Sequence, residues 1–316
     1  MTSRECVRRA LTFKECGEIP TERDDVAAPD FTYGKGRAGG VPVNAKGVRT
    51  DEWGVEWTAA EDGVCGEVKR AAICDWDDLD GFTPPYDVLR EADLSRVNAS
   101  CRSTEKFVMP CWDTSYNLFE RMQHLRGTEQ LFVDIALDEP GLYRLRDLLH
   151  GYFMEQAKLW AETDIDGMHI ADDWGTQTAL LISPEKWKKF FLPCYRDYCD
   201  LAHKHGKYVV MHSDGYTWDI LHSLAEIGVN AVNAQIFCMD IEKLAAEFHH
   251  ELAFWGEIDR QRILPFGTPE DCRRAVRRVA DAFFRYGRTG IVGQAFWGKD
   301  IPQENLDAVY DEWKKI

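Results

Sequence analysis

The stretch YVVMHSDG, residues 208–215, ends an apolar run with two polar side chains. Val210 and its apolar neighbours are typical of a buried strand, and Gly215 is typical of the turn that ends it. Because side chains alternate along a strand, His212 and Asp214 lie on the same face. If Val210 points into a barrel, both polar side chains point toward the barrel axis. The stretch therefore predicts a buried strand that presents a histidine and an aspartate at its carboxyl end.

Strand and helix patterns alternate strictly through the rest of the chain. The strand patterns cover residues 107–112, 166–175, 207–215, 230–236, 251–259 and 290–297, and each is followed by a helical pattern. Such alternation predicts parallel strands with right-handed crossovers. A doubly wound open sheet is the main alternative, but no glycine-rich dinucleotide fingerprint follows any strand. The sequence therefore predicts an α/β fold, a (β/α)8 TIM barrel.

The barrel prediction leaves two strands to be found. The segment EIPTERDDVAAP, residues 18–29, is the candidate for the first strand, and no clear pattern marks the second. Residues 29–85 are rich in Gly, Trp, Asp and Pro and lack helical periodicity, so we expect a loop and hairpin insertion that covers the barrel mouth. A merely irregular surface insertion is the alternative. We predict one domain, residues 1–316, with the second strand within this insertion.

Composition excludes several classes of partner. The chain has 316 residues and a net charge of −16, so nucleic acid and anionic membrane surfaces are disfavoured, because phosphate binding needs clustered Lys and Arg. No apolar stretch approaches the length of a membrane span, and the first twenty residues lack the apolar block of a signal peptide. The ten cysteines form no CxxC pair, and we expect reduced thiols in a cytoplasmic protein. The oligomeric state is not predicted.

Polar side chains end strand after strand. One such residue is unremarkable, because chains leave a sheet into solvent, but several on one mouth predict a site. The adjacent residues Asp172 and Asp173 point to opposite faces if their strand is regular, so one belongs to the site while the other caps a helix opening at Thr176. His169, inside the strand, is expected to be a core histidine. The strand ends carry Asp113, Asp172, Asp173, Trp174, His212, Asp214, Asn233, Gln235, Glu257, Asp259, Gln294 and Trp297.

Four blocks resemble the uroporphyrinogen decarboxylase superfamily, which joins the haem-pathway decarboxylase to corrinoid-linked methyltransferases on a common barrel. The resemblance runs through most of the chain. The blocks are TSRECVRRALTFKECGEIP, the long segment from DIDGMHIADDWG to KYVVMHSDG, WGEIDRQRILPFGTPEDCRRAVRRV and DIPQENLDAVYDEW. They identify the superfamily and its barrel without fixing the reaction.

Departures from the family patterns disfavour two known reactions. The decarboxylase grips the propionates of its substrate through an arginine-bearing segment near the first strand; Arg23 and Arg37 are the nearest candidates and lack that context. Its late Gly-His pair is replaced by AFWG, and an acidic mouth does not match a polyanionic substrate. Thiol-activating methyltransferases bind zinc through His-x-Cys and a later cysteine. Here His212-Ser213-Asp214 stands at the first place, and Gly293, Gln294 and Ala295 stand at the second, so both cysteines are missing and a coenzyme-thiol methyltransferase is not expected.

The resemblance then implies transfer of a methyl group from a methoxylated aromatic substrate to a corrinoid protein. Three residues, His212, Asp214 and Glu257, are the expected ligands of a zinc ion that assists the leaving oxygen. Asp214 and His212, with Asp173, are the expected catalytic residues, with Asp214 as acid. A carboxy-lyase of the decarboxylase type and a non-catalytic corrinoid- or tetrapyrrole-binding barrel are the alternatives. The expected substrate-binding residues are Asp172, Trp174, Tyr116, Gln235, Gln294 and Trp297.

Overall fold

The computed structural model describes residues 1–33, 47–58, 66–111, 114–296 and 298–316. These residues form two compact units. The first unit comprises residues 1–29, 98–115 and 164–316, and the second comprises residues 30–97 and 116–163. The assignment of residues 1–316 to one domain stays a prediction.

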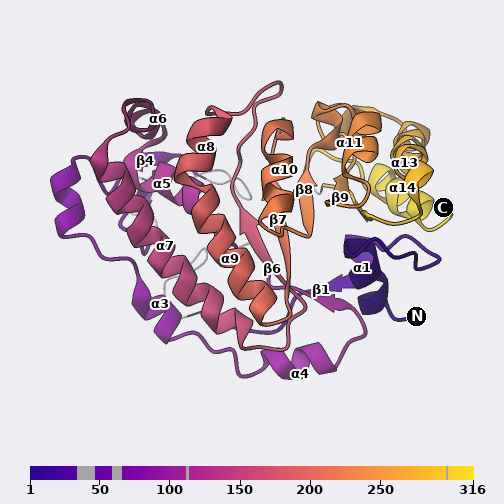
Figure 1. The fold of residues 1–316 in the computed structure, drawn as a ribbon, viewed down its shortest axis with the longest axis horizontal. Coiled ribbons are helices and arrows are strands. Elements are labelled where there is room, and N and C mark those ends of the chain that lie inside the picture. Colours follow the sequence, from indigo (N-terminus) through magenta and orange to yellow (C-terminus); the bar gives the residue numbers. More distant parts are fainter. Residues whose placement is uncertain (34–46, 59–65, 112–113, 297) are drawn as a thin grey trace. The chain divides into compact units, whose positions relative to one another are not determined.

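The first unit is built around parallel strands. Five of them lie side by side in the order β10, β9, β8, β7, β6, and β6 and β7 cross the centre of Figure 1. The short strands β1 (Val26–Ala27) and β5 (Phe107–Val108) form a second parallel pair. The bounds of the five are β6 (Gly167–Ala171), β7 (Tyr208–Ser213), β8 (Ala231–Ala234), β9 (Ala253–Glu257) and β10 (Ile291–Gln294). All six strand patterns from residue 107 onward are therefore strands.

Backbone hydrogen bonds join the two sheets into a ring. The amide of Asp166, just before β6, donates to the carbonyl of Val108 in β5 at 2.7 Å. On the other side, the amide of Gly293 in β10 donates to the carbonyl of Pro20 at 2.8 Å, and Thr21 forms a parallel bridge with Gly293. A closed ring of parallel strands is the predicted barrel, and residues 18–29 hold its first strand as expected.

No strand in the described part of residues 29–85 joins the barrel. β1 pairs directly with β5, so no described strand stands between them. Within residues 29–85, the described strands β2 (Val48–Thr50), β3 (Glu56–Thr58) and β4 (Val68–Arg70) pair with one another in an antiparallel sheet instead. Short hairpin connections favour antiparallel pairing, whereas a barrel strand requires a crossover.

Helix α1 (Ser3–Leu11) closes the amino-terminal end of the barrel. Its residues Val7, Ala10 and Leu11 belong to the same buried cluster as Val210 and Trp255. The cluster confirms that Val210 points into the barrel. Arginines of α1 also hold the buried carboxylate of the residue that precedes β6, through contacts Arg4 Nε–Asp166 Oδ2 at 3.0 Å and Arg8 Nη2–Asp166 Oδ1 at 2.6 Å. With this end closed, a ligand reaches the barrel from the carboxyl ends of the strands.

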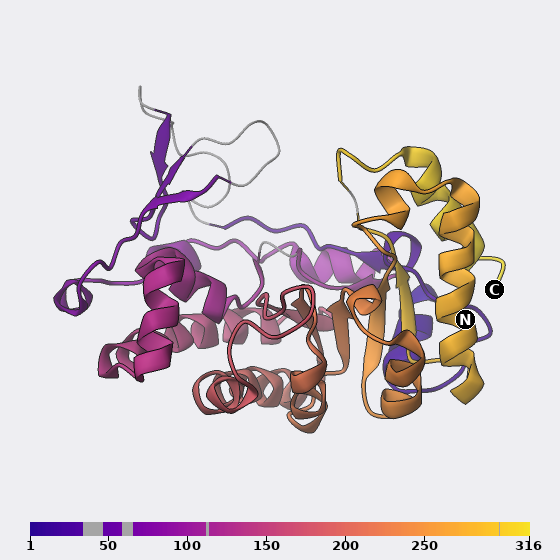
Figure 2. The ribbon, with the colours of Figure 1, turned by 90° about the horizontal axis from the view of Figure 1, so that it is seen from above.

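Helices follow the strands along the outside. α9 packs on β6 and β7, and α13 packs beside α14 near the carboxyl terminus (Figures 1 and 2). The helical pattern that follows β6, residues 183–206, forms two helices that are separated at Phe191, because Pro193 has no amide hydrogen to continue the first one. The bounds are α2 (Glu22–Asp25), α4 (Val97–Arg102), α8 (Pro184–Phe190), α9 (Leu192–Lys204), α10 (Trp218–Glu226), α11 (Ile241–Phe248), α12 (Ile263–Phe266), α13 (Pro269–Phe283) and α14 (Gln303–Trp313).

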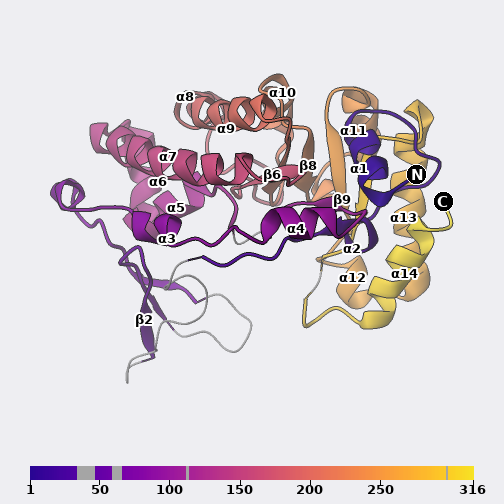
Figure 3. The same cartoon turned by 90° about the horizontal axis from the view of Figure 1, so that it is seen from below.

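The second unit packs helices against one another, with α5 lying against both α6 and α7 (Figure 3). A buried ion pair joins Arg126 Nε of α5 to Asp134 Oδ2 of α6 at 2.7 Å, and the Arg126 guanidinium also stacks on Trp76. Its helices are α3 (Tyr86–Arg90), α5 (Leu118–Arg126), α6 (Thr128–Leu137) and α7 (Pro140–Ala161). Among the helices described in both units, none has the length and apolar character that a membrane crossing requires.

Candidate functional site

A cavity of about 980 Å³ opens at the carboxyl ends of the barrel strands. All of its lining residues belong to the first unit. This is the end of a parallel barrel at which active sites lie. The cavity walls mix apolar side chains with a few charged ones. They include Glu22, Arg23, Met109, Cys111, His169, His212, Asp214, Asn233, Trp255, Glu257, Arg260, Gln294, Phe296, Leu306 and Tyr310.

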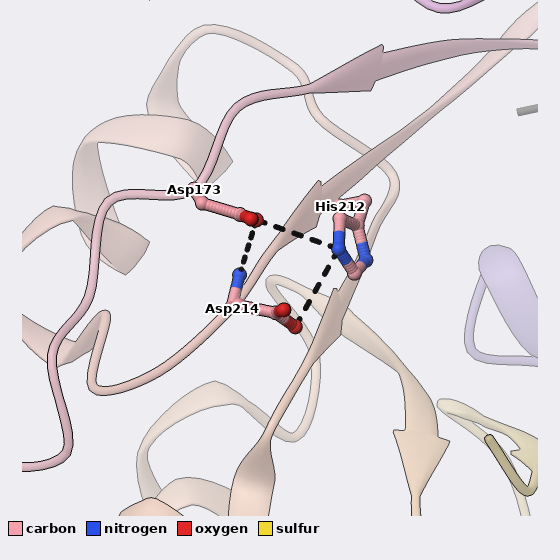
Figure 4. A group of neighbouring side chains, drawn as sticks. All are labelled: Asp173, His212 and Asp214. Atoms are coloured by element: carbon pink, nitrogen blue, oxygen red, sulfur yellow. Dashed lines mark hydrogen bonds and ion pairs between the residues drawn. The ribbon is translucent and has the colours of Figure 1, made fainter. Parts of the chain in front are cut away.

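A histidine and two aspartates meet beyond the ends of β6 and β7 (Figure 4), and two of them, His212 and Asp214, line the cavity. His212 Nε2 lies 3.5 Å from Asp173 Oδ1 and 3.5 Å from Asp214 Oδ1. The pairing of Ala171 with His212 between β6 and β7 explains the meeting, since the residues that follow both strands emerge side by side. The backbone amide of Asp214 donates to Asp173 Oδ1 at 2.9 Å and holds that carboxylate in place. One potential ligand atom from each residue lies within 4.8 Å of the others.

The other ring nitrogen of His212, Nδ1, is held by Asn233 of β8. His212 Nδ1 lies 2.6 Å from Asn233 Oδ1. The Asn233 amide group in turn donates to the carbonyl of Trp255 at 3.0 Å and to Gln294 Oε1. His212 is therefore fixed by a polar chain that crosses from β7 to β10.

One arginine connects two carboxylates at the cavity. Arg260, just after β9, donates through Nη2 to Asp214 Oδ2, and its Nη1 lies 3.5 Å from Glu257 Oε1. The Arg260 guanidinium also lies 4.6 Å from the ring centroid of Phe296. In contrast, Asp214 Oδ1 is a buried atom with no hydrogen-bond donor among the described residues. The Asp214 carboxylate is thus ion-paired through one oxygen and faces His212 with the other.

Burial changes the protonation of two cavity groups. Glu257 is 5% exposed, and burial raises the pKa of its carboxyl from 4.5 to about 7, against the opposing effect of Arg260. Burial, helped by the neighbouring His212, lowers the pKa of His169 to about 3. His169 therefore remains neutral at physiological pH, whereas Glu257 can hold a proton there. His169 lines the cavity, so it is more than a core histidine.

The predicted substrate-binding residues are distributed over several places. Gln294 lines the large cavity, and Gln235 lines a smaller one of about 290 Å³ that shares Glu257 and Arg260 with it. Tyr116 is buried in the second unit near Phe153. Trp297 and Asp113 lie outside the described residues.

Asp172 and Trp174 do not line either cavity. Asp172 Oδ2 accepts a hydrogen bond from the Tyr195 hydroxyl of α9 at 2.6 Å. Trp174 packs in the helix layer against Phe191, with the two ring centroids 4.7 Å apart. Asp172 and Asp173 do face opposite ways, as alternation predicts. No described helix opens at Thr176, however, because the next helix begins at Pro184 with Ser183 as its cap. The expected helix cap is therefore wrong, and Asp172 is a buried contact between strand and helix.

The three residues that could hold a metal ion are not the three predicted ligands. Asp173, predicted to be catalytic, lies with His212 and Asp214, while Glu257 stands outside this group and faces Arg260. Sequence reasoning did not select Arg260, although it follows the strand-end residue Glu257 by three positions. Arg23 does line the cavity, but its guanidinium stacks 4.0 Å from the Tyr310 ring centroid and pairs with Asp307 at 3.2 Å.

Comparisons with known proteins identify the family of the chain. The family model "Uroporphyrinogen decarboxylase (URO-D)" matches residues 54–311. Two curated relatives are named "Methylcobamide:CoM methyltransferase MtbA". The protein from Methanosarcina mazei is 27% identical over 164 residues, and that from Methanosarcina acetivorans is 28% identical over 163 residues. Each match covers 52% of this chain and 47% of the relative, so the chain spans about half the length of the curated relatives it matches.

A solved structure shows the same fold. The "methyltransferase from Methanosarcina mazei" superposes with a TM-score of 0.74 at 13% identity, covering 100% of this chain and 99% of that chain. At this identity the likeness concerns the fold alone. The family model covers well over half of the sequence, from just before β3 to a point within α14. The chain therefore belongs to the uroporphyrinogen decarboxylase (URO-D) family.

Proposed function

We propose that this protein is a methyltransferase that moves a methyl group from a methoxylated aromatic compound to a corrinoid carried by a partner protein. The name of the curated relatives supports corrinoid-linked methyl transfer. The observation that carries the proposal is the group Asp173, His212 and Asp214, whose ligand atoms converge and two of whose members, His212 and Asp214, line a large, mainly apolar cavity. This group suits oxygen chemistry, because it offers nitrogen and carboxylate oxygens where thiol activation uses thiolates.

The donor set fits a zinc ion. The ligands would be His212 Nε2, Asp214 Oδ1 and Asp173 Oδ1. The buried Asp214 Oδ1, which has no hydrogen-bond donor among the described residues, supports this fit because a buried carboxylate oxygen is costly without a partner. Asp214 Oδ2 is held by Arg260, as ligating carboxylates commonly are. When bound, the ion would act as a Lewis acid toward the leaving oxygen.

The reaction requires residues that hold the leaving oxygen and residues that supply it with a proton. The methyl carbon–oxygen bond breaks, the carbon bonds to the Co(I) of the reduced corrinoid, and the oxygen keeps the electron pair and takes a proton. Asp214 was the predicted acid, but its carboxylate accepts a hydrogen bond from Arg260, whereas the same guanidinium lies 3.5 Å from Glu257. Glu257 is the better proton donor, since its buried carboxyl has a pKa of about 7. We therefore assign proton donation to Glu257 and the holding of the leaving oxygen to the histidine–aspartate group.

The cavity walls suit a flat, apolar ring. Apolar and aromatic surface comes from Met109, Trp255, Phe296 and Leu306. Trp255 is fixed by a hydrogen bond from its Nε1 to Glu22 Oε2 at 2.7 Å. Such walls orient an aromatic substrate and exclude water, which would otherwise reprotonate or consume a reduced corrinoid.

The test is methyl transfer by the purified protein with free cob(I)alamin and a set of methoxylated benzenes. Formation of methylcobalamin together with one equivalent of the phenol is expected, with loss of activity in His212→Ala and retention in His222→Ala, whose histidine is exposed on α10. Release of carbon dioxide from uroporphyrinogen would instead establish the carboxy-lyase alternative. Tight binding of cobalamin without any turnover would establish a binding barrel.

A further inference from the structure

A hydrogen-bonded chain anchored on a backbone carbonyl runs beside the histidine of the site. Its members are His212 of β7, Asn233 of β8 and Gln294 of β10, and the anchor is the carbonyl of Trp255 in β9. Asn233 is 4% exposed, so its amide must satisfy its hydrogen bonds within the protein.

The anchor fixes which end of the Asn233 amide faces which neighbour. A carbonyl oxygen can only accept, so the Asn233 atom that lies 3.0 Å from the Trp255 carbonyl must be the donating Nδ2. The second hydrogen of Nδ2 points to Gln294, which must accept it through Oε1. The remaining Asn233 atom, Oδ1, is an acceptor, and it lies 2.6 Å from His212 Nδ1. His212 Nδ1 must therefore carry the proton.

We propose that Asn233 is a positioning residue that holds the imidazole proton of His212 on Nδ1 and so keeps the electron pair of Nε2 directed at Asp173 and Asp214. The inference rests on the proposed function for its purpose, because a metal ion or an acidic proton at this place needs that electron pair. The protein thereby reverses the preference of free neutral histidine in water, which carries its proton mainly on Nε2.

The same chain also includes Gln294. Gln294 Oε1 accepts a hydrogen bond from Asn233 Nδ2, whose orientation the Trp255 carbonyl already fixes. The NH₂ group of Gln294 then becomes the end that can donate to a ligand oxygen in the cavity that Gln294 lines.

The experiment is a long-range ¹H–¹⁵N correlation spectrum of the metal-free protein, labelled at its histidines. The spectrum is recorded at a pH at which His212 is neutral, and the His212→Asn variant assigns the signal. A protonated Nδ1 and an unprotonated Nε2 are expected in the wild-type protein. An unprotonated Nδ1 and a protonated Nε2 in the wild-type protein would overturn the proposal, independently of the results for the variants.

Three variants separate positioning from simple packing. Asn233→Leu keeps the branching at Cγ but removes the acceptor, and it should shift His212 toward the Nε2-protonated form. Asn233→Asp keeps an acceptor and should restore the Nδ1 proton. Gln294→Ala should leave the tautomer unchanged, because the Trp255 carbonyl still orients the amide. An unchanged His212 pattern in a folded Asn233→Leu protein would contradict the proposal.

Zinc titration gives a second readout that does not depend on methyl transfer. Loss of such an outer hydrogen bond should weaken zinc binding by about 10–100-fold in Asn233→Leu. Failure of every methoxylated substrate would refute the proposed function and leave the tautomer result standing. A wild-type Nε2-protonated histidine in an active enzyme would refute the positioning role and leave the function standing.

Discussion

Replacing Glu257 by Gln tests whether the pKa of the buried carboxyl at the cavity is raised. The folded protein holds the pKa of this carboxyl at about 7, against 4.5 for an unperturbed glutamate. Below pH 4.5 the group is protonated in both the folded and the unfolded chain, and it does not affect their balance. As the pH rises, the unfolded chain loses the proton first, so the wild-type protein loses stability until the pH passes the folded pKa.

The magnitude follows from the two pKa values. The shift corresponds to about 3 kcal/mol of unfolding free energy, most of it lost between about pH 5 and pH 8. A glutamine cannot ionise and avoids this loss, so Glu257→Gln should gain stability relative to the wild type as the pH rises. Urea unfolding at several pH values measures the difference. Glu226→Gln, at an exposed position in α10, is the matched control and should follow the wild-type curve.

The same variant should lose activity, since glutamine has no proton to give. Methyl transfer should slow by about 10²–10⁴-fold, and less for substrates whose leaving phenol is more acidic. If the free energy of unfolding of the wild type and of Glu257→Gln changed equally with pH, the assignment of a buried, proton-holding carboxyl would be refuted. Equal slowing for all phenols would refute its role as the acid.

Three further outcomes are expected. Arg260→Gln should raise the pKa of Glu257 further, because the guanidinium opposes the effect of burial. A ¹³C NMR titration of the side-chain carboxyl measures this pKa, and a lower value would contradict the assigned effect of Arg260. His212→Ala should abolish stoichiometric zinc binding, measured by metal analysis, with an unchanged melting temperature; full retention of zinc would remove His212 from the site. Asp172→Asn should cost about 1.5–3 kcal/mol of stability in urea unfolding, because a buried hydrogen bond from Tyr195 to a charged group is weakened, while KM stays unchanged; a raised KM would place Asp172 at the substrate.

The sequence predicted the barrel because its signal is periodic and local. Strand patterns such as the one around Val210 are apolar runs ended by glycine, and alternation along β7 correctly placed His212 and Asp214 together. The second strand could not be located, since the short strands of residues 29–85 carry no feature that distinguishes a hairpin from a barrel strand. The break at Phe191 was missed because the apolar periodicity continues through it, although Pro193 marked it.

The site was less accessible to sequence reasoning, because it depends on the direction of individual side chains. Asp172 and Asp173 are adjacent and chemically equal, and only the position of Tyr195 on α9 decides that Asp172 is buried in the helix layer. Glu257 ends its strand like the other candidates. Its separation from the group formed by Asp173, His212 and Asp214 follows from Arg260, whose side chain reaches back over the cavity.

The most direct test of the central claim is the spectrum of cob(I)alamin mixed with the purified protein and 1,2-dimethoxybenzene. We expect the Co(I) spectrum to convert to that of methylcobalamin, with one equivalent of 2-methoxyphenol released. With the His212→Ala variant we expect no conversion. Conversion that is unchanged in His212→Ala would contradict the assigned site. Absence of methylcobalamin with every methoxylated aromatic, alongside transfer from methylcobalamin to a thiol, would contradict the claim itself.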